Sequence, residues 1–92
     1  METVKAIVTV IGRDRTGIIA DVCSILAQNG VNVLDISQTI MHDYFTMIMM
    51  VDMSGCKLAF ADLAKLLREE GENTALSIRI QREDIFEAMH RI

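Results

Sequence analysis

The sequence contains no proline and no tryptophan, and its aromatic residues are one tyrosine and three phenylalanines. Basic residues are in the minority, because 9 lysines and arginines stand against 13 aspartates and glutamates, which gives a formal net charge of −4. Nucleic-acid-binding surfaces neutralise phosphates with lysine and arginine, and those for single strands also stack bases on aromatic rings. The composition therefore argues against nucleic acid as a partner.

Cysteine is also scarce. Cys23 and Cys56 lie far apart in the chain, and no CxxC pair occurs. This pattern fits neither the disulfide framework of a small secreted protein nor a zinc site. We therefore expect two buried, reduced thiols, no metal site and no cofactor.

Long apolar runs are missing as well. The longest uncharged apolar stretches, such as residues 45–51, are far shorter than the ~18 residues of a membrane-spanning helix. The N-terminus lacks the charged region and apolar core of a signal peptide. We expect a cytoplasmic protein with no membrane partner.

What the chain does have is apolar content. Its 92 residues are 51% hydrophobic, which is enough for one core without disulfides or a structural metal. We therefore treat residues 1–92 as a single domain.

Hydrophobic periodicity divides this domain into seven elements. Continuous or alternating apolar patterns predict four strands, over residues 4–11, 31–41, 44–53 and 76–80. Apolar residues at helical spacing predict helices over residues 16–28, 58–70 and 81–92, the last of them a C-terminal helical extension. Asn29 and Gly30 supply the end signal of the first helix, and Gly71 that of the second. His42 and Asp43 are typical of a tight turn between two strands.

The resulting order, βαββαβ plus a terminal helix, predicts an α+β, ferredoxin-like sandwich with an antiparallel sheet of order 4-1-3-2. The strands over 4–11 and 44–53 are apolar at both alternating sets of positions, which predicts central strands buried on both faces. The strand over 31–41 places Leu34, Ile36 and Ile40 on one face and polar residues on the other, as an edge strand does.

Two helices cover only one face of such a sheet. The apolar outer face of the central strands then needs a cover, from the terminal helix, from a partner subunit, or from both. We therefore expect a homo-oligomer, most simply a dimer.

The loop over residues 12–18 contains two glycines and two arginines, and it leads directly into a helix N-terminus. Unpaired N–H groups and the positive end of the helix dipole make such a place receptive to a carboxylate or phosphate, with Arg15 nearby. A P-loop is excluded because Ile18 and Ile19 stand where lysine and serine or threonine are required. The alternative is an ordinary turn in which Asp14 or Thr16 caps the helix and the arginines are solvated.

The run from Gly12 to Ile19, followed by Leu26, the segment 30–33 and Asp35-Ile36, resembles an ACT domain. The similarity is greatest to short stand-alone ACT proteins, and the segments 78–86 and 88–92 extend it over essentially the whole chain. ACT modules are regulatory domains that commonly bind amino acids or other small effectors at a subunit interface.

The resemblance implies a ligand site that joins the loop after the first strand to the region of the second strand in a neighbouring chain. Carried over position by position, it implies Asp14, Thr16, Gly17 and Ile18 on the loop side and Asn32 beyond the Gly30 turn. Some amino-acid-binding members have asparagine at the position of Asp14. An ionised Asp14 can only accept hydrogen bonds, which suits a ligand's ammonium group.

The sequence contains few residue patterns that are typical of a catalytic site. His42 and His90 have no cysteine or serine at a recognisable nucleophile spacing, so we interpret both as surface residues and predict no catalytic residue. Acylphosphatase shares the topology and uses an arginine and an asparagine, for which Arg13 or Arg15 and Asn32 are candidates. That family, however, has an arginine in the first turn of the helix, where this chain has apolar and acidic residues. The methionines over 47–53 are interpreted as packing.

The sequence thus favours a non-catalytic regulatory module that senses an amino acid or similar effector at a homodimer interface and regulates an unidentified protein in trans. A protein–protein interaction subunit without a ligand is the first alternative, and an acylphosphatase-like hydrolase is the second.

Overall fold

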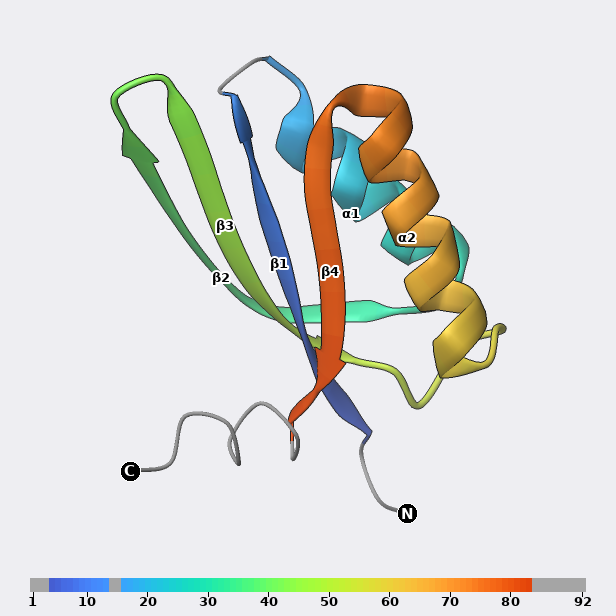
Figure 1. Cartoon of the computed structure of the whole chain (residues 1–92). Coiled ribbons are helices and arrows are strands. Elements are labelled where there is room, and N and C mark those ends of the chain that lie inside the picture. Colours follow the sequence, from blue (N-terminus) through green and yellow to red (C-terminus); the bar gives the residue numbers. More distant parts are fainter. Residues whose placement is uncertain (1–3, 14–15, 84–92) are drawn as a thin grey trace.

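The computed structural model describes residues 4–13 and 16–83. Four strands and two helices follow one another in the order βαββαβ (Figure 1). Their bounds are β1 Lys5–Arg13, α1 Ile18–Gln28, β2 Asn32–Met41, β3 Tyr44–Asp52, α2 Phe60–Thr74 and β4 Leu76–Arg82.

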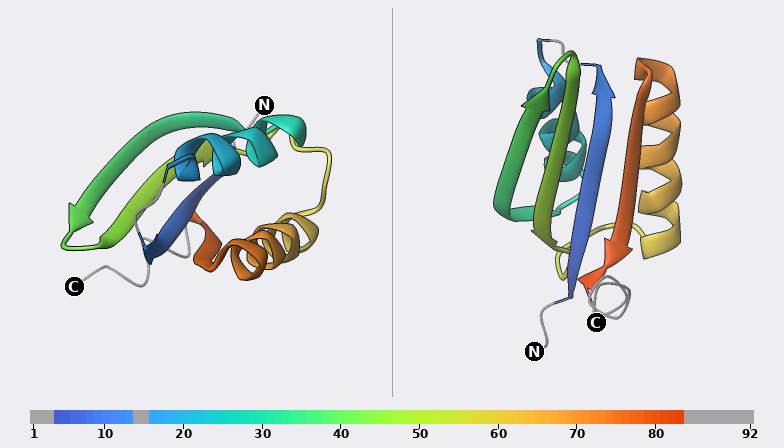
Figure 2. Two further views of the ribbon diagram at one scale, coloured as in Figure 1. Left: turned by 90° about the horizontal axis from the view of Figure 1, so that it is seen from above. Right: turned by 60° about the vertical axis from the view of Figure 1, so that its left-hand side comes forward.

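The four strands form one antiparallel sheet of order β2-β3-β1-β4, so β1 and β3 are central and β2 and β4 are edges. Both helices pack on the same face of this sheet (Figure 2). The predicted ferredoxin-like α+β fold and its order 4-1-3-2 are confirmed.

The core lies between the inner face of the sheet and the two helices. Alternate residues of β1 and β3, such as Val8 and Met49, point into it and are fully buried. Ile18, Val22 and Leu26 enter it from α1, and Leu63 and Leu67 enter it from α2. Met47 and Met49 are fully buried here, which confirms packing as the role of these two methionines.

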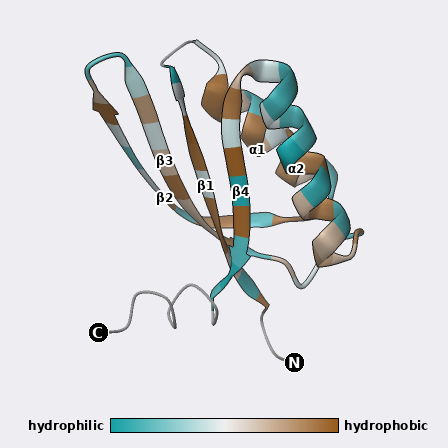
Figure 3. Cartoon of the chain, in the orientation of Figure 1, coloured by the Kyte–Doolittle hydropathy of each residue, from teal (hydrophilic) through white to brown (hydrophobic). Residues whose placement is uncertain are grey.

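The outer face of the sheet differs from its prediction. Ile7 is buried there, but Ile11 is 46% exposed and Ile48 is 42% exposed, although β1 and β3 were predicted to be buried on both faces. The reason is that both helices lie on the opposite face. Ile11 and Ile48 are therefore exposed on a sheet face that neither α1 nor α2 covers (Figure 2), and both belong to strands with apolar segments (Figure 3).

The end of α1 follows its prediction. Gly30 has a positive φ of 79°, its N–H donates to the carbonyl of Ala27, and the N–H of Val31 donates to that of Leu26. This pair of bonds is the Schellman motif, in which a glycine in the left-handed region closes the helix. Leu26 and Val31 are both buried, so the apolar contact that accompanies the motif is also present.

The end of α2 does not follow its prediction. The helix passes through Gly71 and ends at Thr74, and Ala75 takes the left-handed conformation with φ 60°. A Cβ on Gly71 would lie 2.6 Å from the carbonyl oxygen of Leu76. The glycine is therefore required for close approach of α2 to β4 rather than for a turn.

Strand β2 contains a β-bulge that the alternation did not predict. Val33 pairs with Val51 and Asp35 pairs with Met50, so Leu34 is an extra residue between the two pairs. The alternation reverses at this point. Ile36 and Ile40 lie on the inner face of the sheet, whereas Leu34 is the unpaired residue of the bulge. The prediction that these three residues share one regular strand face is therefore wrong for Leu34.

The last strand is longer than predicted, because Gln81 and Arg82 belong to β4 and not to the helical extension. The rest of that predicted extension, from residue 84 onward, lies outside the described residues, as does His90. Cys23 and Cys56 are free thiols of intermediate exposure rather than fully buried ones. Neither α1 nor α2, the helices of the described part of the chain, is long and apolar enough to cross a membrane.

Candidate functional site

A groove of about 520 Å³ lies where the first turn of α1 faces the far end of β2. One wall is the helix start, and the other is the inner face of β2 with the neighbouring end of β3. The lining residues are Gly17, Ile18, Ile19, Ala20, Gln38, Ile40 and Phe45.

Backbone geometry at Gly17 sets the helix wall. Gly17 is the N-cap of α1 with φ 91°, a conformation that residues with a Cβ rarely adopt, and its carbonyl accepts the N–H of Asp21 at 2.9 Å. The N–H groups of Ile18, Ile19 and Ala20 precede that first helical bond and have no acceptor within the helix. They present the positive end of the helix dipole at the groove.

The strand wall is mainly apolar. Gln38 lies opposite Met47 and Ile40 lies opposite Phe45 in the β2–β3 ladder, which places Gln38 and Ile40 on the inner face. Phe45 is buried, whereas Ile40 is 59% exposed. The Gln38 side-chain amide can both donate and accept a hydrogen bond. The groove therefore combines backbone donors, one amide and an apolar wall, which suits a small ligand with a carboxylate and an apolar part.

The structure places two of the predicted site residues in this groove. Gly17 lines it directly, and Ile18 contributes to it although its side chain is only 2% exposed. Ile18 therefore offers its backbone N–H rather than its side chain. Thr16 is exposed immediately before Gly17, outside the groove lining. Asp14 and Arg15 lie outside the described residues.

Asn32 is not brought to the groove within one chain. It begins β2 opposite Asp52, whereas Ile40 lies near the other end of the same strand. At ~3.3 Å per residue, this separation is roughly 26 Å. Asn32 is exposed and could meet the groove only from a second copy.

Sequence reasoning missed Gln38 and Phe45 as lining residues, and it considered Ile40 only as an apolar edge residue. The available signal was the shared parity of positions 36, 38 and 40, which places a polar residue among apolar ones on the same strand face. This signal does not predict a groove by itself, because the groove also requires α1 to lie opposite this strand face, and the alternation says nothing about the position of α1.

The described residues do not assemble the acylphosphatase-like pair. Arg13 ends β1 opposite Tyr44, and Asn32 lies opposite Asp52 at the other end of β3. Arg15 is not among the described residues. Over 4–13 and 16–83, no group of three or more histidine, cysteine, aspartate or glutamate residues is arranged to hold a metal ion.

One carboxyl group has a shifted pKa. The backbone N–H and the hydroxyl of Ser54 donate hydrogen bonds to Asp52 Oδ1 at 2.9 and 2.7 Å. These bonds, helped by the charge of Lys5, hold the pKa of Asp52 below its ordinary value. The lowered pKa favours the ionised form of Asp52, which accepts both hydrogen bonds from Ser54 in the turn after β3.

The comparisons with known proteins agree with this architecture. A sequence model described as the ACT domain matches residues 5–81. The UPF0237 proteins of Methanocaldococcus jannaschii and of Neisseria meningitidis serogroup A are each 52% identical over 88 residues, which are 96% of this chain and 98% of the relative. An ACT domain protein from Streptococcus pneumoniae superposes with a TM-score of 0.82 at 42% identity, covering 97% of this chain and all of that one.

Proposed function

Because this chain belongs to the ACT domain family, we propose that it is a non-catalytic regulatory module that binds an amino acid or a similar small effector. The module works as a homodimer and regulates a cytoplasmic protein in trans. The observation that carries this proposal is the groove between the start of α1 and the far end of β2.

The groove fits the two ends of an amino acid. A carboxylate accepts hydrogen bonds from the N–H groups of Ile18 and Ile19, where the helix dipole favours negative charge. An apolar side chain then lies along Ile40, and the Gln38 amide bonds a polar atom of the ligand. Asp14 and Arg15 remain in the proposed site on the strength of the sequence, with Asp14 as acceptor for the ligand's ammonium group.

A homodimer would bring the Asn32 end of β2 toward this site. β2 is a sheet edge, and most of its residues are exposed. Antiparallel pairing of two such edges about a two-fold axis places the Asn32 end of one copy beside the Met41 end of the other. Asn32 of a second copy then lies beside the Met41 end of β2, and because Asn32 pairs with Asp52 its side chain belongs to the outer face, so its backbone is the part that approaches the groove.

Thermal unfolding in the presence of each of the common amino acids tests the proposal. A ligand at about 100 times its dissociation constant adds ~2.7 kcal/mol of stability, which raises the melting temperature of a small domain by several degrees. Calorimetry with Gln38→Ala then locates the site, and Ser24→Ala, on the exposed surface of α1, is the control. Retention of full affinity by Gln38→Ala places the ligand elsewhere.

The apolar residues Ile36 and Ile40 on an exposed edge strand favour a second candidate, an interaction subunit that needs no ligand. If no amino acid stabilises the protein, this function replaces the first. Hydrolysis of a model acyl phosphate that is abolished by Arg13→Ala, with folding intact, would contradict both.

A further inference from the structure

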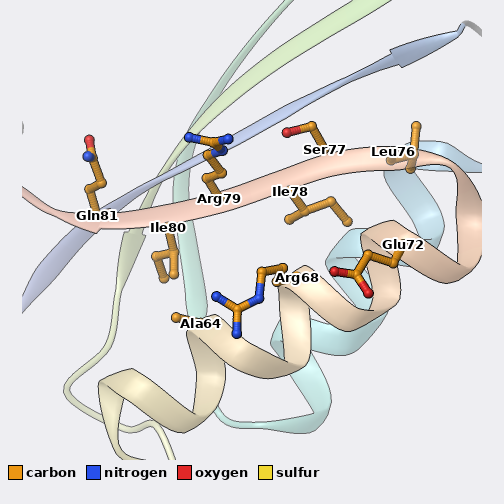
Figure 4. A pocket seen from close by; sticks show the side chains of 9 residues that line it. All are labelled: Ala64, Arg68, Glu72, Leu76, Ser77, Ile78, Arg79, Ile80 and Gln81. Carbon is orange, nitrogen blue, oxygen red and sulfur yellow. The ribbon is translucent and has the colours of Figure 1, made fainter.

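A second groove, of about 550 Å³, lies between α2 and β4 (Figure 4). Among the described residues, β4 pairs with β1 on one side only, so its other side is a sheet edge there. Every second residue of such an edge directs its backbone N–H and C=O away from the sheet. Ala64, Arg68 and Glu72, which are spaced by four residues, line the groove from α2.

Two arginines lie beside this edge on its two faces. Ile78 and Ile80 point from β4 toward α2, which carries Arg68, and Arg79 points from β4 to the opposite face (Figure 4). Arg68 and Arg79 lie at the same level along the strand in this view and line the same groove.

Neither guanidinium is neutralised within the described part of the chain. Arg68 and Arg79 are exposed and form no ion pair there, although Glu72 follows Arg68 by four residues. The chain as a whole has a formal net charge of −4. The groove lining therefore carries two arginines and one glutamate, Glu72, so its formal charge is positive in a chain of negative net charge.

We propose that β4 and α2 form a docking site for an extended acidic peptide segment of a partner protein, which adds to the sheet as a fifth strand. The open edge supplies main-chain hydrogen bonds. Successive residues of a strand face opposite sides, so acidic residues at two adjacent positions of the peptide reach Arg68 and Arg79 respectively. Guanidinium groups bind carboxylates through paired hydrogen bonds, which gives the site its preference.

Protection of the edge against aggregation is a competing role for a charged residue on β4. Arg79 alone suffices for that role. It does not explain Arg68, which lines the groove from α2. The site lies at the opposite edge of the sheet from β2, so it does not depend on effector binding in the first groove.

Two fluorescently labelled peptides of seven residues, the length of β4, test the proposal. Both have alternating valine and threonine, except that positions 4 and 5 are glutamates in one peptide and lysines in the other. We expect the acidic peptide to bind at least about tenfold more tightly and to shift the backbone amide resonances of β4 in NMR spectra. The double variant Arg68→Glu, Arg79→Glu should reverse the preference, whereas Lys57→Glu, outside the groove, should leave it unchanged.

Four outcomes overturn the proposal. In the first, the backbone amide resonances of β4 do not shift when the acidic peptide is present at about 1 mM, a concentration at which even weak binding would be seen. Both peptides bind equally well, or the double variant folds and keeps its preference for glutamate. Alternatively, the β4 amides shift with the concentration of the protein alone, which assigns this edge to a second copy of the chain. None of these results bears on amino acid binding at α1.

Discussion

Gly30 and Gly55 pack against each other so closely that a Cβ on Gly30 would collide with the carbonyl oxygen of Gly55. This contact joins the turn after α1 to the turn after β3. The N–H of Lys57 donates to the carbonyl of Asn29 at 2.9 Å beside it. The two connections at this end of the sheet are thus fixed to each other by backbone atoms.

Gly30→Ala should therefore destabilise the protein in two ways. The added Cβ strains a backbone with φ 79°, and it displaces the turn that contains Gly55. Gly17→Ala is the matched control, because Gly17 has φ 91° but a Cβ there meets nothing within 4 Å. Strain alone costs ~1–2 kcal/mol, so we expect that loss at Gly17 and a larger one at Gly30 in urea denaturation. Equal losses would show that the turns separate at little cost.

Gly71→Ala should also destabilise, against the usual preference of helices. In an exposed helix interior, alanine is favoured over glycine by about 1 kcal/mol. A Cβ at position 71, however, would lie 2.6 Å from the Leu76 carbonyl oxygen and push α2 from β4. Ala61→Gly, at an exposed position of the same helix, measures the ordinary preference. Chemical denaturation of both variants should give losses of stability, and a gain for Gly71→Ala would contradict the close packing.

Acid should weaken the turn after β3. Hydrogen bonds from Ser54 lower the pKa of Asp52 in the folded state, so this group stabilises the fold above its ordinary unfolded pKa of ~3.9. That contribution disappears as the pH falls through the lower, folded pKa. Asp52→Asn should flatten the acid limb of the stability curve, and Ser54→Ala should flatten it partly. Unfolding curves from neutral pH down to about pH 2 test this, and unchanged limbs in both variants would refute it.

Ile40→Glu should separate association from folding. Ile40 is 59% exposed in the single chain, so a glutamate costs the monomer little, on the order of 0.5 kcal/mol. In the proposed dimer of β2 edges, the same change places charge in an apolar contact and should yield monomers by light scattering. Val8→Glu, in the core, should instead prevent folding. An intact dimer in Ile40→Glu would move the interface to another surface.

Features that depend on local sequence could be predicted. Asn29 and Gly30 end α1 as expected, because a Schellman motif is specified by residues close in sequence. The central strands were identified from their continuous apolar patterns, but the burial of both faces that these patterns predicted was wrong, because both helices cover the inner face and leave Ile11 and Ile48 exposed. The order of the strands followed from the handedness of βαβ connections.

Features that depend on approach between elements could not be predicted. A glycine such as Gly71 is typical of a helix end, and its place within α2 is explained by the close approach of β4. The groove residues Gln38 and Phe45 come from two strands and acquire their role from the position of α1. Gly17 was identified because its role is local, whereas Asn32 belongs to the opposite end of β2.

The bulge at Leu34 has a consequence for the length of the chain. The pairs Val33 with Val51 and Asp35 with Met50 are already adjacent on the β3 side, so removal of Leu34 leaves both halves of β2 in their present register. Deletion of Ser37, by contrast, would turn Gln38 and Ile40 to the opposite face relative to Ile36. Leu34 is therefore the place in β2 where relatives can differ by one residue and still keep the same groove.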